Sequence, residues 1–245
     1  MGDTKRADFY DGPVHDYLRY WDGRDYENAA ERIALDRLLR GQHFAHAVDV
    51  GGGYGRLSTQ LYRYADRVTL AEPSARQLAI AAGVNPALET VQAQAADLPF
   101  ADGTVDLVTM IRVMHHLPDP RPELAEIARV LDPVGLAILE VANLGHFRNR
   151  LRHPRTPAGP VDIRSPENRH DNEIPFVNHN VRTVTAQLAE AGLSVERTLS
   201  VSNFRSATLK KLVPQRMLLR LERAAQPALA PLLFGPSIFL LLRKH

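Results

Sequence analysis

The chain has 245 residues, of which 44% are hydrophobic and 24% charged, as in an ordinary globular domain. It contains no cysteine, which excludes disulfides, thiolate metal sites, iron–sulfur clusters and cysteine nucleophiles. The net charge of +2 conceals an asymmetry, because residues 1–143 carry 14 basic and 21 acidic side chains whereas residues 144–245 carry 16 and 7. The basic C-terminal part indicates an acidic ligand, an anionic membrane surface or simply an uneven solvated surface.

No stretch of the sequence is long and apolar enough to predict a membrane-spanning helix. The most apolar one, 227–242, is interrupted by Pro231 and Pro236 and falls short of the roughly 20 residues that a spanning helix needs. The first residues lack the apolar core of a secretory signal. We therefore expect a cytoplasmic protein.

A helix is predicted from Tyr26 to Arg40, because apolar residues recur there with helical spacing and Gly41 follows. A valine-rich strand over 47–50 comes next, and then a stretch in which every second residue is glycine: Gly51, Gly53, Gly55. Such a stretch allows sharp turns and the close approach of a ligand. Because helical spacing resumes after it and continues to about Ala65, free backbone amides at the helix start predict a nucleotide site.

The spacing of these glycines separates two classes of nucleotide site. The dinucleotide pattern G-x-G-x-x-G requires a third glycine at position 56, where the chain has Arg56. The glycine comes one residue earlier, and Asp49 precedes the turn by two residues. The resulting D-x-G-x-G-x-G pattern resembles that of the class I S-adenosylmethionine (SAM) dependent methyltransferases. An NAD(P)-dependent oxidoreductase is accordingly disfavoured.

A second predicted strand, 67–72, ends on Glu72, which lies 21 residues after Gly51. A carboxylate at this spacing accepts hydrogen bonds from the ribose hydroxyls of a nucleotide. The alternative is a surface glutamate before a turn. The strand end, the spacing and the residue type together favour the ribose role.

The loop that follows a third predicted strand, 88–94, strengthens the resemblance. The sequence of this loop is Ala96-Asp97-Leu98-Pro99-Phe100. The helix between the second and third predicted strands begins at Ser74, which is predicted to cap it. The resemblance implies that Asp97 takes the adenine amino group and that the backbone amide of Ala96 faces a ring nitrogen. The alternative is that Asp97 only forms a turn.

Two histidines follow the fourth predicted strand, 105–111, where ligands of open α/β sheets bind. His115 and His116 are candidate general bases, because histidine titrates near neutrality, or they only pack and shape the pocket. The resemblance places Arg112 near the amino group of the cofactor's methionine moiety, which the glycine turn meets. Asp49 either orders that turn or meets the same amino group.

The remaining chain divides into parts of different character. A helix over 119–131, a turn over 132–135 and a strand over 136–141 complete a predicted SAM-binding core, 43–143, which follows an N-terminal helical cap, 1–42. Residues 144–180 are rich in proline, arginine and histidine and fit no helix or strand of length, so we expect an insertion that acts as a lid, with a mere linker as the alternative. Its histidines lack the pairing of a metal site. The C-terminal part, 181–245, is predicted to complete the sheet with these elements: a helix over 183–191, a strand over 193–201, a basic helical run over 206–225 that Pro214 interrupts, and a strand over 237–243.

Strands alternating with helices predict one α/β domain, doubly wound and Rossmann-like. The resemblance implies a mostly parallel seven-stranded sheet of order 3-2-1-4-5-7-6, with strand 7 antiparallel and helices on both faces. Its segment before the first helix can lie over the cofactor, so Tyr20 or Trp21 covers a ligand or packs on the core.

The resemblance also implies the cofactor SAM, the product S-adenosyl-L-homocysteine and a small-molecule acceptor, lipid-like or acidic. We expect no nucleic-acid partner, because Arg112-Val113-Met114-His115 stands where base-methylating relatives carry Asn/Asp-Pro-Pro-aromatic. Peripheral membrane contact through the basic C-terminal third is a further expectation. The alternative function is a non-catalytic SAM-binding module or scaffold. The acceptor, the methylated atom and the oligomeric state stay open.

Overall fold

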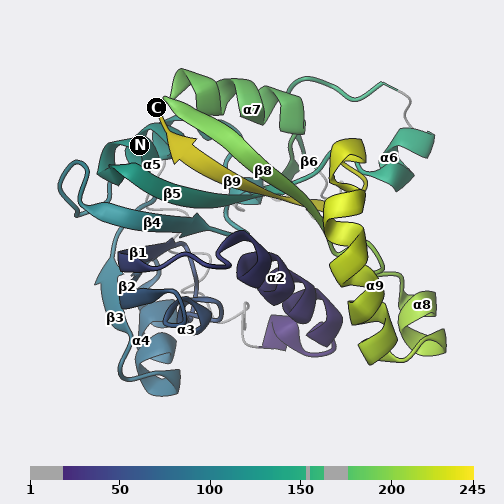
Figure 1. Ribbon diagram of the computed structural model, residues 1–245, viewed down its shortest axis with the longest axis horizontal. Helices are drawn as coiled ribbons and strands as arrows, with labels where there is room; N and C mark the ends of the chain where they lie inside the picture. Colours follow the sequence, from purple (N-terminus) through teal and green to yellow (C-terminus); the bar gives the residue numbers. More distant parts are fainter. Residues whose placement is uncertain (1–18, 153–154, 163–175) are drawn as a thin grey trace.

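In the computed structural model, which describes residues 19–152, 155–162 and 176–245, a seven-stranded sheet lies between helices (Figure 1). The strand order is β3-β2-β1-β4-β5-β9-β8. The first five strands of this order, β3, β2, β1, β4 and β5, are parallel to one another. Strand β9 is antiparallel to both β5 and β8. Since β8 and β9 are the sixth and seventh strands of this sheet, the predicted order and the antiparallel strand are confirmed. The strands are β1 (Phe44–Val50), β2 (Ala65–Glu72), β3 (Glu89–Gln92), β4 (Val105–Met110), β5 (Leu131–Ala142), β8 (Leu193–Val201) and β9 (Ser237–Lys244).

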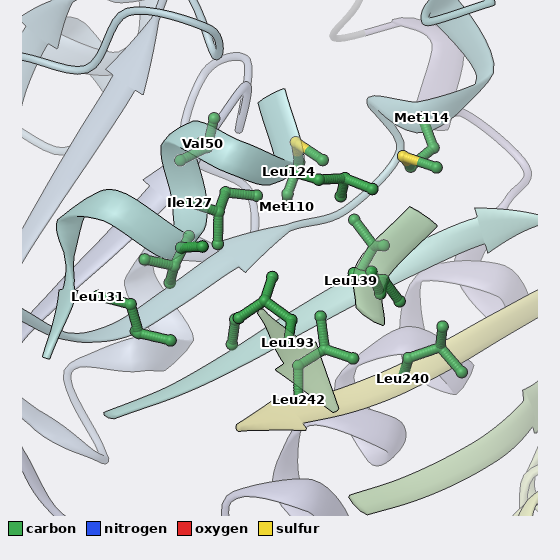
Figure 2. Close-up of a cluster of buried hydrophobic side chains, with 14 of the residues drawn as sticks. Val50, Met110, Met114, Leu124, Ile127, Leu131, Leu139, Leu193, Leu240 and Leu242 are labelled. Carbon is green, nitrogen blue, oxygen red and sulfur yellow. The ribbon is translucent and has the colours of Figure 1, made fainter. Parts of the chain in front are cut away.

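Helices cover both faces of the sheet and bury an apolar layer on each. One layer packs below α5 and α7, where Leu124 and Ile127 of α5 lie over Leu139 and Leu240 of the strands (Figure 2). The other layer contains side chains of α2 and α3, and α9 packs against α2 and β8. Because side chains of a strand alternate between faces, neighbouring residues of β5 and β9 enter different layers. The helices are α2 (Asp25–Leu38), α3 (Ser58–Leu61), α4 (Ala75–Val84), α5 (Arg121–Val130), α7 (Val181–Glu190) and α9 (Gln215–Ala228).

Two predicted element boundaries were wrong. The helix expected to reach Ala65 ends at Leu61, because β2 begins to pair with β1 at Ala65 and the chain must leave the helix before that point. The expected turn over 132–135 lies inside β5 instead. There the register with β4 shifts from Val105–Leu131 to Leu107–Leu136, so the extra residues form an irregularity within one strand.

The predicted insertion contains short elements in its described part. They are α6 (Phe147–Arg152) and the antiparallel pair of β6 (Val161–Asp162) and β7 (Val177–Asn178). Residues 153–154 and 163–175 of the insertion, like residues 1–18 of the predicted cap, lie outside the described residues. The lid role therefore stays a prediction, as does the division into cap, core, insertion and C-terminal part.

The basic run of the C-terminal part forms two helices on either side of Pro214, α8 (Ala207–Leu212) and α9. Leu218, Glu222 and Gln226 of α9 are buried, and the other side of the helix carries exposed arginines. None of the helices in the described part of the chain combines the length and apolarity needed to cross a bilayer. Peripheral membrane contact and cytoplasmic location remain predictions.

Candidate functional site

The glycine turn follows β1 at the carboxyl edge of the sheet, and its backbone requires glycine. Gly51, Gly53 and Gly55 have φ angles of 66°, 62° and 80°, in the left-handed region that side chains disfavour. Space is also limiting, because a Cβ on Gly51 would lie 2.5 Å from a Val113 methyl group, and one on Gly55 would lie 2.6 Å from a Leu88 methyl group. The turn is thus a backbone cradle, as the sequence predicts.

Asp49 lies beneath this cradle and is 2% exposed. Its carboxylate accepts hydrogen bonds from Ser58 Oγ at 2.6 Å and from Thr109 Oγ1 at 2.7 Å. Burial raises the pKa of Asp49, and these two hydrogen bonds oppose the shift. These bonds join β1 to α3 and β4, and a Cβ on Gly52 would lie 2.4 Å from Asp49 Oδ2. The geometry therefore favours the turn-ordering role, and contact with the amino group of a ligand stays a prediction.

Glu72 joins the end of β2 to the cradle. Its buried carboxylate accepts the backbone N–H of Gly53 at 2.9 Å through Oε2 and that of Ser74 at 3.1 Å through Oε1. A carboxylate accepts about four hydrogen bonds, so these two are compatible with a role in holding ribose. The sequence spacing thus corresponds to direct contact between the acid and the glycine turn.

Asp97 and Ala96 lie in a tight loop, closed by a hydrogen bond from Asp97 N to Gln94 O at 3.0 Å. Glu126 and Arg129 of α5 hold the next residues, since Glu126 accepts Leu98 N at 2.7 Å and Arg129 donates to Leu98 O at 3.0 Å. The Asp97 side chain is exposed, and no described residue donates a hydrogen bond to it. The loop therefore presents an open carboxylate on a fixed backbone.

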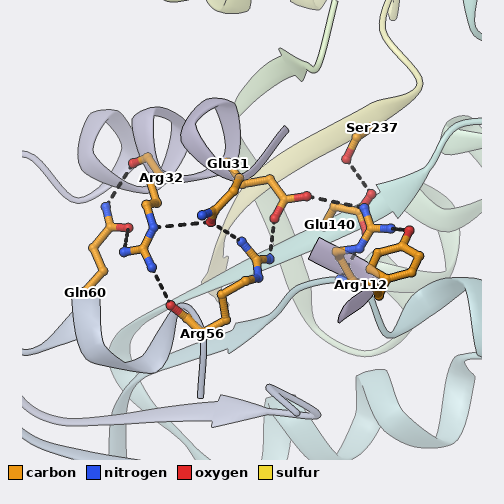
Figure 3. A network of polar contacts seen from close by, with 9 residues as sticks. Glu31, Arg32, Arg56, Gln60, Arg112, Glu140 and Ser237 are labelled. Atoms are coloured by element: carbon orange, nitrogen blue, oxygen red, sulfur yellow. Dashed lines mark hydrogen bonds and ion pairs between the residues drawn. The ribbon is translucent and has the colours of Figure 1, made fainter. Parts of the chain in front are cut away.

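Arg112 is the node of a polar network at the end of β4 (Figure 3). Its φ of 63° is unusual for a residue with a side chain, and its N–H donates to the buried Glu140 at 3.1 Å. Its guanidinium donates to Glu31 at 3.3 Å and to the Tyr20 hydroxyl at 2.6 Å. Burial raises the pKa of Glu140, and the Arg112 charge and a hydrogen bond from Ser237 oppose the shift.

Glu31 also binds Arg56, which follows the glycine turn directly (Figure 3). The Arg56 guanidinium lies 3.6 Å from the centroid of the Trp21 ring. Trp21 and Tyr20 are thus tied to the turn and to Arg112. Trp21 is buried, and that this segment also covers a ligand stays a prediction. Sequence reasoning missed Glu31, Arg56 and Glu140. The one available signal was a charged residue, Glu31, on the apolar face of α2.

His115 and His116 lie in a short 3-10 helix, η2 (Met114–His116), with ring centroids 3.9 Å apart. The Phe176 ring lies beside both, with its centroid 5.5 Å from that of His115 and 4.7 Å from that of His116. His179 Nε2 forms a hydrogen bond with Met114 O at 2.8 Å. Burial, together with the charges of His116, Arg112 and His179, holds the pKa of His115 well below its usual value. His115 is therefore neutral near pH 7, which leaves it able to accept a proton but makes it a weak base.

Phe176 and His179 were not predicted as site residues, because more than fifty positions separate them from the histidine loop and no sequence pattern links them. Across the described residues, no group of histidine, aspartate and glutamate side chains is arranged to hold a metal ion.

Comparisons with known proteins point to one family. The family described as "Methyltransferase domain" matches residues 48–139. An uncharacterised methyltransferase of Mycobacterium sp. (strain JLS) is 36% identical over 92 residues, which cover 38% of this chain and 36% of that protein. An O-methyltransferase of Aspergillus nomiae is 31% identical over 141 residues, covering 52% and 61%.

A solved structure from Thermotoga maritima has the same fold. It is described as a SAM-dependent methyltransferase and possible histamine N-methyltransferase. The two structures superpose with a TM-score of 0.70 over 96% of this chain and 98% of that one, at 18% identity. The sequence matches are shorter, and the chain spans about a third to a half of the length of the Mycobacterium relatives that it matches.

Proposed function

We propose that this chain is a SAM-dependent methyltransferase that transfers the methyl group of SAM to a small-molecule acceptor. The match of the methyltransferase-domain family to residues 48–139 and the shared fold support this proposal. The observation that carries the proposal is the hydrogen bond between Glu72 and the amide of Gly53. This bond places an acid, at the sequence position from which carboxylates bind ribose, against a turn in which ligand atoms can approach the backbone.

The residues of this chain fit the cofactor. The cradle of Gly51, Gly53 and Gly55 would meet the methionine part, Glu72 the ribose and the open carboxylate of Asp97 the adenine amino group. When bound, SAM supplies an electrophilic methyl group on a sulfonium. The protein's own contribution is to orient the acceptor and to exclude water.

Tyr20 and Trp21 would cover the site, and Arg112 and Arg56 hold them in place. For a hydroxyl acceptor, His115 is the candidate to receive the proton, since it is partly exposed whereas His116 is buried. The names of the relatives include both an O-methyltransferase and a possible N-methyltransferase, so the methylated atom is not part of the proposal.

Calorimetric titration of SAM and of S-adenosyl-L-homocysteine tests the cofactor site. We expect Glu72→Ala to weaken binding about tenfold or more, because a hydrogen bond to a charged group contributes roughly 1.5–3 kcal/mol. Glu89→Gln, which changes an exposed acid of β3 paired with Arg67, is the matched control. Lack of binding by the wild-type chain would refute the proposal.

Activity is then tested with labelled SAM and a panel of hydroxyl and amine acceptors. Methyl transfer that depends on the acceptor supports an enzyme. Cofactor binding without transfer to any acceptor would instead favour a non-catalytic SAM-binding module.

A further inference from the structure

A cavity of about 260 Å³ opens where the chain leaves β5 and β8 and enters β9. Three segments line it: 146–148 at the start of α6, 202–206 after β8, and 234–236 before β9. These segments are far apart in sequence but adjacent in space, since Phe147 N donates to Phe234 O at 3.0 Å. Figure 1 shows α6 near the C-terminal end of α9.

One wall of the cavity is apolar. The rings of Phe147 and Phe234 stack with centroids 4.8 Å apart and planes 19° from parallel. Phe147 is 43% exposed and Leu209 is 38% exposed, so apolar surface remains accessible at this place. Such a wall suits the flat apolar body of a small molecule.

Another wall is positively charged. Arg148 and Arg205 both line the cavity, and neither donates a hydrogen bond nor forms an ion pair to another residue in the described part of the chain. Both side chains are exposed. Partial desolvation and the like charges of Arg112 and Arg148 lower the pKa of Arg205. The carboxylate that opposes this shift, Glu27, is already paired with Lys210 at 2.9 Å.

The loop that carries Arg205 is held in place from behind. The buried carboxylate of Glu222 accepts Ser202 N at 2.8 Å and Asn203 N at 3.1 Å, and the Tyr26 hydroxyl accepts Phe204 N at 3.0 Å. Ser202 has a φ of 62°, a conformation that these bonds sustain. The backbone of this loop is therefore held in place before any ligand arrives, which lowers the entropy cost of binding.

The cavity also adjoins the network at the end of β4. Glu140 of β5 binds both Arg112 N and the hydroxyl of Ser237, and Ser237 directly follows the cavity residue Pro236. The cavity therefore lies next to the polar network at the carboxyl edge of the sheet.

We propose that this cavity selects an acceptor with an apolar body and an oxyanion, either carboxylate or phosphate, which Arg148 and Arg205 bind while Phe147 and Phe234 contact the body. Arginine suits both groups, because its planar guanidinium donates two parallel hydrogen bonds to their oxygens. The inference rests on the proposed function, because the bound molecule is an acceptor only if the protein transfers a methyl group. It adds the chemical class of that acceptor.

The test uses three probes of similar body with the full chain: 3-phenylpropionate, phenyl phosphate and the neutral 3-phenylpropanamide. Calorimetry measures the Kd of each probe. We expect at least one anion to bind about tenfold or more tightly than the amide, and the two anions tell a carboxylate site from a phosphate site. Equal affinity for amide and anions, or no binding of either anion to the wild-type chain, would overturn the proposal.

Variants locate the binding. Arg205→Gln and Arg148→Gln should each weaken anion binding about tenfold and leave the amide unchanged. Arg216→Gln, on the exposed side of α9 and outside the cavity, should change neither. Anion affinity that stays at the wild-type value in both cavity variants would refute the assignment.

A SAM titration on the same samples shows that each variant is folded and separates the two proposals. If the wild-type chain binds SAM but neither anion, the proposed acceptor site is refuted and the proposed methyltransferase function is not. If it binds an anion but not SAM, the proposed methyltransferase function is refuted and the anion site is not.

Discussion

The buried carboxylate of Glu31 forms an ion pair with the guanidinium of Arg56, and this pair joins α2 to the residue that follows the glycine turn. Arg56 stands where a dinucleotide-binding turn has its third glycine. The same carboxylate reaches Arg112 at the end of β4. One acid of α2 thereby connects this helix to two loops at the carboxyl edge of the sheet.

Glu31→Gln should lower the free energy of unfolding by about 3–5 kcal/mol, because it leaves Arg56 buried without its counter-charge. Urea denaturation measures the change. The control is Glu89→Gln, which removes an exposed pair with Arg67 and should cost no more than about 1 kcal/mol. Losses of equal size in the two variants would contradict a special contribution from the buried pair.

Gly55→Ala should weaken SAM binding about tenfold or more, since its φ is +80° and the added Cβ would lie 2.6 Å from Leu88 Cδ2. Calorimetric titration gives the affinity. Gly83→Ala in α4 is the matched substitution, where nothing lies within 4 Å, and should stabilise the protein by up to about 1 kcal/mol. Unchanged SAM affinity in Gly55→Ala would show that the turn tolerates a side chain.

Stability should fall as the pH drops below the ordinary histidine pKa of about 6.5. The pKa of His115 is lowered in the folded state by burial and neighbouring positive charge, so the unfolded chain binds this proton more readily. The contribution is fully present above about pH 6.5 and is lost as the pH falls toward the folded-state pKa.

The His115→Gln variant isolates this contribution from that of other titrating groups. Its stability should decline less steeply than that of the wild type between about pH 6.5 and 5, by up to roughly 1.4 kcal/mol per pH unit. Urea denaturation at several pH values provides the comparison. Parallel curves for the two proteins would mean that His115 does not titrate differently on folding.

Tyr26→Phe should lower the free energy of unfolding by about 1–3 kcal/mol, because Phe204 N loses its acceptor and the buried Glu222 loses one of its donors. It should also weaken 3-phenylpropionate binding, since the loop of Arg205 loses a support, while SAM affinity stays unchanged. Tyr62→Phe removes a hydroxyl bound to Ala87 O on an exposed ring and should have little effect on either quantity. Loss of SAM binding in Tyr26→Phe would point to general unfolding instead.

Local and periodic features of this protein were predictable from its sequence. The turn at Gly51, Gly53 and Gly55 depends on backbone conformations that the chain itself dictates. The position of Glu72 follows because one helix and one strand bring the chain back to the same sheet edge. The sheet order was predictable from the resemblance together with the alternation of strands and helices. The helix end at Leu61 was not, because pairing of β2 with β1 decided it against the local apolar spacing.

Tertiary structure decided which distant groups meet. Glu31 joins Arg56 and Arg112, Phe176 packs on the histidine loop, and Arg148 and Arg205 line one cavity. These contacts depend on the packing of α2 on the sheet and on the return of the chain at β8 and β9. No periodicity encodes them, since their energies come from burial and charge that exist only after the elements pack. The sequence alone therefore determined the fold and the candidate cofactor cradle, and the packed chain determined the network and the cavity that give the proposed site its specificity.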